Sequence, residues 1–196
     1  MEEEKSFYSK PRDERYYGVG GFIVEIIKIF LLAFVIIVPI RVFLFQPFFV
    51  QGASMEPNFE NGDYLIVDEL SYRFREPQRG EVIVFKYPGD RSQRYIKRII
   101  GLPGETIEIK EGEIVVSSQG KQYVLDESRY LSSNFKTPGK ILVTLGQNEY
   151  FVLGDNRFFS YDSRRWGLLP KEDLIGRVFL RILPFTALAK IEAPAY

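Results

Sequence analysis

The chain of 196 residues contains no histidine and no cysteine. Without cysteine it forms no disulfide and carries out no thiolate chemistry, and without both residues it lacks the commonest zinc ligands. We therefore expect no metal and no cofactor. A nucleophilic serine here would also lack the usual imidazole base. A buried lysine that loses its proton near neutral pH is the remaining candidate for that role.

The sequence also lacks an excess of charge of either sign, because 26 Lys and Arg are balanced by 26 Asp and Glu. No overall field attracts a polyanion, so we expect no nucleic-acid partner. The length is sufficient for one well-buried globular domain and an appendage.

The longest apolar run covers residues 22–40 and is interrupted only by Glu25 and Lys28. A helix needs roughly 20 apolar residues to cross a bilayer. The two charged residues are three positions apart, on one helix face near the N-terminal end, where they can reach the interface. We predict a tail at 1–20, a transmembrane helix at 21–43 and one further domain at 44–196. The alternative is a buried helix of a soluble core.

Flanking charges predict the orientation of this helix. Four basic residues precede it: Lys5, Lys10, Arg12 and Arg15. Arg41 lies at its far end, and the next basic residue along the chain is Arg73. The positive-inside rule then places the N-terminus in the cytoplasm and the larger domain outside it. No small-x-small site closely follows the run, which favours a retained anchor over a cleaved signal peptide. The tail is rich in acidic residues, unlike a transit peptide, so we expect a bacterial cytoplasmic membrane protein.

Beyond the run, short segments rich in β-branched and aromatic residues alternate with turn signals, and no long amphipathic helix is evident. We therefore predict a mostly β domain. Residues 117–148 are more polar and are interpreted as an insertion. A tight hairpin is expected at Glu111-Gly112. The expected strands are 64–67, 81–86, 94–100, 106–110, 113–116, 121–125, 141–144, 149–153 and 176–182.

Four clusters of turn-forming, polar and charged residues follow one another along the domain. Considered alone, Ser54 would be an ordinary turn serine and Lys97 a solvent-facing strand residue. If Lys97 shares a face with Tyr95, however, it leaves water, and desolvation lowers its pKa. The clusters are Gly52-Ala53-Ser54-Met55-Glu56-Pro57-Asn58, Gly62-Asp63-Tyr64-Leu65-Ile66-Val67, Lys97-Arg98-Ile99-Ile100-Gly101-Leu102-Pro103-Gly104-Glu105 and Gly154-Asp155-Asn156-Arg157-Phe158-Phe159-Ser160-Tyr161-Asp162-Ser163-Arg164-Arg165-Trp166-Gly167.

Together these clusters resemble the type I signal peptidases, membrane-anchored serine/lysine proteases that cut signal peptides from exported preproteins. The resemblance extends from the apolar run to about Pro184, and the fourth cluster is its most specific part. It implies an antiparallel β-sheet catalytic domain. It also implies that secretory preproteins are the substrates and the lipid bilayer a partner, while the oligomeric state stays open.

The resemblance implies a role for each matching residue. Ser54 would attack the scissile carbonyl, and neutral Lys97 would take the hydroxyl proton and later activate water to hydrolyse the acyl-enzyme. Ser160 would hydrogen-bond the Lys97 amine. A supporting ion pair would be formed by Asp162 and Arg164 together with Arg98.

A shallow apolar pocket for small side chains at the first and third positions before the cut is also implied. For each of its residues core packing is an equally good interpretation. The matching positions are Phe49, Val50, Gly52, Met55, Phe59, Tyr95 and Ile96. A nearby aromatic cluster is expected at the membrane surface and consists of Phe43, Phe45, Phe48 and Phe49.

The sequence departs from the family pattern in two places. Many relatives carry a serine two residues before the nucleophile, and its hydroxyl supplies the second oxyanion donor; this chain has Gly52. Asn58 replaces the usual threonine. Two alternatives therefore stay open: a self-cleaving serine/lysine relative, and a membrane-tethered β domain that binds peptides without cutting them.

Overall fold

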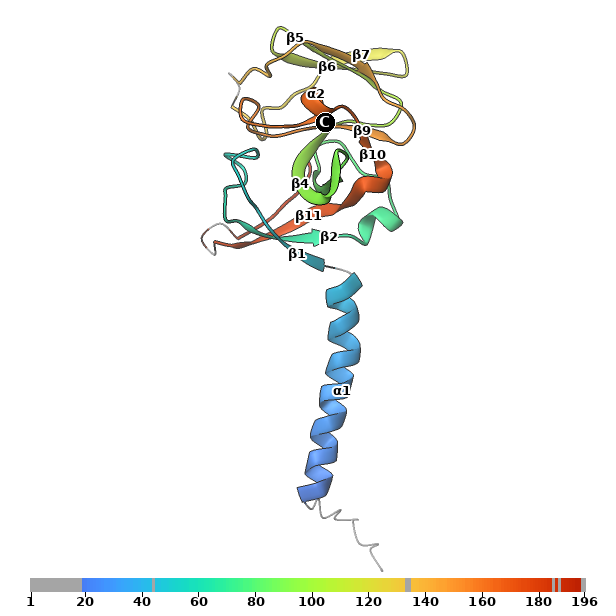
Figure 1. The fold of residues 1–196 in the computed structure, drawn as a ribbon, viewed down its shortest axis with the longest axis vertical. Coiled ribbons are helices and arrows are strands. Elements are labelled where there is room, and N and C mark those ends of the chain that lie inside the picture. Colours follow the sequence, from blue (N-terminus) through green and yellow to red (C-terminus); the bar gives the residue numbers. More distant parts are fainter. Residues whose placement is uncertain (1–18, 44, 133–134, 185, 187, 195–196) are drawn as a thin grey trace, which may run out of the picture. The chain divides into compact units, whose positions relative to one another are not determined.

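The computed structural model describes residues 19–43, 45–132, 135–184, 186 and 188–194 (Figure 1). It divides into two units, one up to residue 40 and one from residue 41 onward. Residues 1–18 of the predicted tail, with their predicted cytoplasmic location, lie outside the described residues, and residues 19 and 20 already belong to the N-terminal helix. The side chains of Phe43 and Phe45 also lie outside the described part.

Helix α1 spans Val19–Phe43, and the first unit holds its part up to residue 40. Its apolar side chains from residue 19 to 37 are almost all exposed, and they surround the helix rather than forming one stripe. Within the described part of the chain, Val19–Ile37 is the one stretch long and apolar enough to cross a membrane. A helix that is apolar on all sides needs an apolar environment on all sides.

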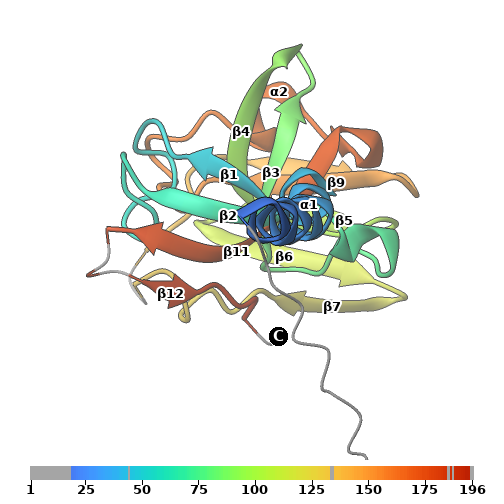
Figure 2. The same ribbon diagram turned by 90° about the horizontal axis from the view of Figure 1, so that it is seen from below.

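The second unit consists of two antiparallel sheets, seen from two directions in Figures 1 and 2. The larger sheet has the order β1-β2-β11-β3-β4-β9-β10, with β12 added to β11. Its strands are β1 Phe45–Phe49, β2 Tyr64–Asp68, β3 Val82–Tyr87, β4 Asp90–Gly101, β9 Glu149–Leu153, β10 Leu169–Pro170, β11 Leu174–Leu183 and β12 Ala189–Lys190.

The smaller sheet has the order β7-β6-β5-β8. Its strands are β5 Thr106–Lys110, β6 Glu113–Ser118, β7 Lys121–Val124 and β8 Ile141–Thr144. Three short helices complete the unit: η1 Ser71–Arg73, α2 Ser163–Trp166 and η2 Lys171–Asp173. The predicted mostly β, antiparallel fold with one apolar N-terminal helix is confirmed.

All nine predicted strands are present; β5, β8 and β9 have the predicted ends, and the other six have one or both ends shifted. The largest difference is in β4, which begins at Asp90 because Tyr87 and Asp90 already pair across the β3–β4 hairpin. This hairpin projects from the sheet in Figure 2. The predicted tight turn joins β5 to β6, and both its residues, Glu111 and Gly112, have positive φ (55° and 89°), as a two-residue hairpin of this type requires.

Strand β1 was not predicted from the sequence, because its residues continue the apolar run and include Pro47. Proline cannot donate to a β ladder and is found on edge strands. β1 is such a strand: in the described structure it pairs only with β2, where Pro47 faces Ile66. The short strands β10 and β12 were not predicted either.

Residues 117–148 contribute to the domain core. β7 and β8 complete the smaller sheet on either side of β6 and β5. Leu125 and Leu145 are buried with the isoleucines of β5 and β6 in one apolar cluster. The segment between β7 and β8 reaches the larger sheet, where it contacts the site described next.

Candidate active site

Ser54 lies in the loop that connects the edge strand β1 to β2. The loop is closed at its base by two backbone hydrogen bonds, Val50 N to Asp63 O (2.9 Å) and Gly62 N to Val50 O (3.0 Å). The next side chain, Met55, is 1% exposed and anchors the loop in the core. Burial of Val50 four residues before it and of Met55 directly after it therefore holds the partly exposed Ser54 at the surface of the larger sheet.

Lys97 lies in the middle of β4, and its side chain reaches the Ser54 loop. Its Nζ is 2.7 Å from Ser54 Oγ and donates a hydrogen bond to the carbonyl of Ile96 (2.8 Å). The amine also lies 5.6 Å from the ring centroid of Tyr95, so these two residues share a face of the strand, as the alternation predicts. The structure therefore brings together the serine and the lysine that the sequence analysis selected.

The surroundings of Lys97 lower the pKa of its amine to about 8. Burial is the main cause, because the side chain is only 4% exposed and the charged form loses its hydration. Asp162 and Asp155 act in the opposite direction through their charge. Neither forms an ion pair with this amine in the described structure. A substantial fraction of the amine is therefore neutral near pH 8 and able to accept a proton.

The loop after β9 supports the nucleophile loop from the other side. Asn156 donates its backbone N–H to Ser54 O (3.1 Å) and its side-chain amide to Ala53 O (3.0 Å). Gly154 leaves no room for a side chain: a Cβ there would overlap Ser54 O and lie 2.5 Å from Ser160 Cβ. The two loops are thus in direct backbone contact next to the nucleophile.

Ser160 does not make the hydrogen bond to Lys97 that was expected. Its Oγ is buried and has no hydrogen-bond partner in the described part of the chain. The Lys97 amine is instead engaged by Ser54 and by the backbone carbonyl of Ile96. Ser160 does help to lower the pKa of Asp162, so its hydroxyl lies near that carboxylate without reaching normal hydrogen-bond geometry.

Asp162 and Arg164 form an ion pair of 2.8 Å. Burial opposes ionisation of Asp162, but the hydrogen bonds and charge of Arg164 hold its pKa below the ordinary value. Asp162 also caps α2 and accepts the backbone N–H of Gly154 (3.1 Å). The prediction that Arg98 joins this pair is wrong: Arg98 pairs with Asp155 at 2.6 Å, on the opposite face of β4 from Lys97.

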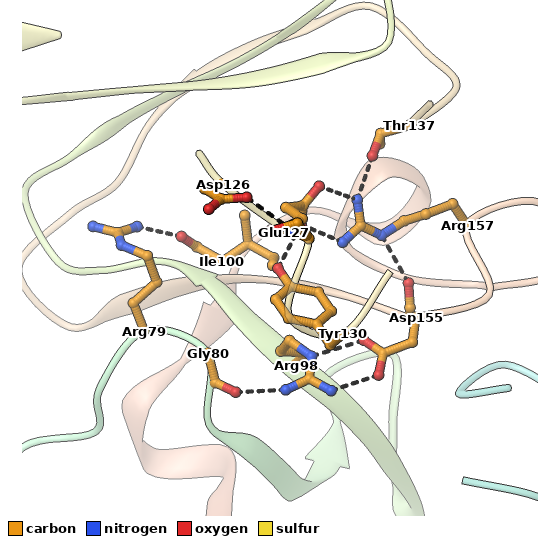
Figure 3. Close-up of polar contacts among 12 residues, drawn as sticks. Arg79, Gly80, Arg98, Ile100, Asp126, Glu127, Tyr130, Thr137, Asp155 and Arg157 are labelled. Carbon is orange, nitrogen blue, oxygen red and sulfur yellow. Dashed lines mark hydrogen bonds and ion pairs between the residues drawn. The ribbon is translucent and has the colours of Figure 1, made fainter. Parts of the chain in front are cut away.

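Arg98 and Asp155 belong to a buried polar network (Figure 3). Asn58 donates to Asp155 (2.8 Å), and the ring of Tyr130 lies 4.1 Å from the Arg98 guanidinium. The network continues from the Tyr130 hydroxyl, which donates to Glu127 (2.6 Å). It therefore connects the segment between β7 and β8 with the strand that carries Lys97.

Arg157 is the most deeply buried cation of this network, with 1% exposure. It pairs with Glu127 (2.5 Å) and donates to Gly154 O (3.0 Å). The sequence analysis assigned no role to Asp155, Arg157 or Glu127. The first two lie in the fourth cluster, which marked them as unusual, whereas no sequence signal distinguished Glu127.

A cavity of about 250 Å³ opens beside Ser54 and Lys97. Of the predicted pocket residues, Phe49, Tyr95 and Ile96 line it, together with Phe48, Gln51 and Arg94. Phe49 is 54% exposed and Phe48 packs partly against the core.

Three predicted pocket residues are placed elsewhere. Val50, Met55 and Phe59 are 1–2% exposed and belong to the core cluster behind the cavity, because the chain turns inward after β1. Gly52 is exposed, has φ of 89° and donates its N–H to Asn61 (2.9 Å).

A serine hydroxyl at hydrogen-bond distance from a buried amine, on a scaffold of antiparallel sheets, is typical of the serine hydrolases that use lysine as base. The family model described as "Signal peptidase, peptidase S26" matches residues 23–183. The chain belongs to this family of serine peptidases.

Relatives from several bacteria are similar over most of their length. A probable signal peptidase I-2 of Synechocystis is 37% identical over 166 residues, which cover 82% of this chain and 73% of the relative. A signal peptidase I of Leptolyngbya laminosa is 34% identical over 182 residues, covering 88% and 85%. The signal peptidase I P of Bacillus subtilis subsp. natto is 36% identical over 166 residues, covering 79% and 85%.

Proposed function

We propose that this protein is a membrane-anchored endopeptidase that cleaves N-terminal signal peptides from exported preproteins, with Ser54 as nucleophile and neutral Lys97 as general base. The observation that carries the proposal is the 2.7 Å contact between the Ser54 hydroxyl and a buried amine whose pKa is lowered to about 8. Family membership and relatives named signal peptidase I support the choice of substrate.

In the proposed reaction Ser54 Oγ attacks the scissile carbonyl while the neutral Lys97 amine accepts its proton. The resulting ammonium gives this proton to the leaving amine, and the C–N bond breaks to leave an acyl-enzyme. The amine, neutral again, then takes a proton from the water that attacks the ester, and it returns this proton to Ser54 Oγ as the ester C–O bond breaks to release the acid. The Lys97 amine transfers the proton in both half-reactions, and its burial favours the neutral form between them.

The oxyanion needs donors that are already oriented. The backbone N–H of Ser54 has no acceptor in the described structure and is available for this role. Gly52 offers no hydroxyl, and its own N–H is engaged by Asn61.

The edge of β4 supports binding of an extended substrate. Up to Lys97 this strand pairs only with β3 in the described structure, and β9 joins it from Arg98 onward. A peptide added to the free edge would present its first and third residues before the cut on one face. The small cavity between Phe49 and Ile96 would then favour small side chains at both positions.

Helix α1 supports the membrane-anchored part of the proposal, since its described side chains are apolar on all sides. With the four basic residues that precede the helix in the cytoplasm, the domain from residue 44 to 196 would face the exterior. The substrates, still held by their signal peptides in the same bilayer, would then be presented to it.

The function is tested with the purified full chain in detergent and a preprotein with an Ala-x-Ala site. We expect cleavage directly after that site, seen as a product with the matching N-terminal mass. Substitution of the first or third alanine by tyrosine should block it, because we propose that both positions accept only small side chains. An intact preprotein, or cleavage only of the peptidase itself, would contradict the proposal.

The pH dependence follows from the direction of the Lys97 shift. Below its pKa of about 8 the amine is protonated and cannot act as base, so kcat/KM should fall about tenfold per pH unit toward acid and level off above pH 8. A profile that is flat between pH 6 and pH 9, with chemistry rate-limiting and the protein folded throughout, would argue against Lys97 as the base.

A further inference from the structure

The path of the substrate beyond the cut is limited by the larger sheet. A peptide on the free edge of β4 cannot follow this strand past Lys97, because from Arg98 onward the edge is taken by β9, where Arg98 faces Leu153. The chain beyond the cut must therefore leave the strand and cross the loop that follows β9. Phe158 in this loop is 63% exposed.

A cavity of about 600 Å³ lies at this loop. Ser160 lines it and also contacts Gly154, which adjoins the carbonyl of the nucleophile Ser54. The cavity is therefore close to the reacting groups, and it is distinct from the cavity of about 250 Å³ that Ser54 itself lines.

The charges of this cavity have a single sign. Four of its lining residues are cations, Lys140, Arg157, Arg164 and Arg165, and none of its described lining residues is acidic. The charges of two of these cations are neutralised by ion pairs, since Arg157 pairs with Glu127 and Arg164 with Asp162. The cavity thus has a positive wall.

The other two cations are available to a ligand. Lys140 and Arg165 are exposed, and neither side chain makes a hydrogen bond or ion pair with any described residue. Beside them Phe158 adds an apolar edge, which is held by contact of its ring with Phe135 at 5.6 Å. A carboxylate on a short aliphatic stem matches this combination of charge and apolar surface.

We propose that this cavity binds an acidic side chain of the substrate in the first several residues after the cut, so that Lys140 and Arg165 give the enzyme a preference for acidic mature N-termini. The inference rests on the proposed function, because it assigns a binding site to a second part of the same preprotein substrate. It goes beyond that function by making the charge of the mature segment a determinant of cleavage.

The experiment uses the full chain in detergent and preproteins that share one signal peptide and one Ala-x-Ala site. Aspartate, asparagine or lysine is placed in turn at each of the first six positions after the cut. We expect aspartate to raise kcat/KM about three- to tenfold over lysine at one or two adjacent positions, as for a partly exposed ion pair. The ratio should shrink at high salt.

The double variant Lys140→Glu with Arg165→Glu should reverse this preference. A matched control, Lys110→Glu with Lys121→Glu at exposed positions of strands β5 and β7, changes the net charge equally and should keep the preference. The ratio of the aspartate to the lysine substrate is the readout, so a loss of folded enzyme cancels. The milder variant Lys140→Gln with Arg165→Gln should abolish the preference without reversing it.

The outcomes separate the inference from the function it rests on. Cleavage that ignores the charge of the mature segment overturns the inference and leaves the proposed function intact. A preference that survives in both cavity variants overturns the assignment to this cavity. Failure to cleave any of the preproteins overturns both.

Discussion

Ser54→Ala and Lys97→Met are each expected to lower preprotein cleavage by about 10³-fold or more, because each removes one half of the reacting pair. Methionine is chosen at position 97 because it fills nearly the same buried volume without an amine. The double variant should be no slower than either single variant, since the hydroxyl and the amine act as one unit. Cleavage is measured as single-turnover rate at pH 8.5.

The Lys97→Met variant should lose activity while it gains stability. In the folded protein the pKa of Lys97 is about 8, below its ordinary value of 10.5, so the unfolded chain binds this proton more tightly. At pH 7 the charged amine therefore disfavours folding, by about 1–3 kcal/mol once the lost hydrogen bonds are considered. This disadvantage of the wild type should disappear as the pH rises from 8 to 10.5.

Lys86→Met is the matched control for this prediction. Lys86 lies on the neighbouring strand β3 but is exposed, so both activity and stability should stay close to the wild type, within about 0.5 kcal/mol. Thermal unfolding at pH 7 and pH 10 measures the stability difference. Retention of more than a tenth of the wild-type rate in Ser54→Ala or Lys97→Met would remove the residue from the reaction.

The fold could be predicted from the sequence where local patterns dominate. The alternation in β5 and β6 and the turn at Glu111-Gly112 fix the hairpin without help from the rest of the chain. β1 could not be predicted, because only pairing with β2 distinguishes it from the end of the apolar run. Pro47 disfavours a strand by itself, and an edge position is needed to accommodate it.

The candidate site shows the same division between local and tertiary information. Ser54 and Lys97 were identified because the absence of histidine left few bases and because their neighbours resemble a known family. The partner of Arg98 could not be inferred, since two acids of the same cluster, Asp155 and Asp162, were both available. Glu127 is 30 residues from Arg157, and only the folded chain brings them together.

Gly154 is the second residue for which a large effect is expected. Its φ is within the ordinary range, so the backbone itself would accept alanine; the obstacle is space. The added Cβ would overlap Ser54 O and the Ser160 hydroxyl, and Ser54 O belongs to the rigid backbone of the nucleophile loop. Gly154→Ala should therefore displace the nucleophile loop and the loop after β9 from each other.

A displacement of about 1 Å of a reacting group can cost 100-fold in rate, and we expect Gly154→Ala to lose at least about that much in kcat/KM. Its stability should fall by about 1–3 kcal/mol, as for overpacking of a well-packed interior, so the protein stays folded at the assay temperature. Both quantities are measured on the same preparation, by preprotein cleavage and by thermal unfolding.

Gly146→Ala is a suitable control, because the nearest atom to its new Cβ is the end of the flexible Glu149 side chain, 2.9 Å away, which can rotate aside. This variant should keep its activity within about twofold, as expected for a surface substitution away from the site. Gly154→Ala with near wild-type cleavage would mean that the contact between the two loops does not position Ser54. The close packing at Gly154 would then serve stability alone.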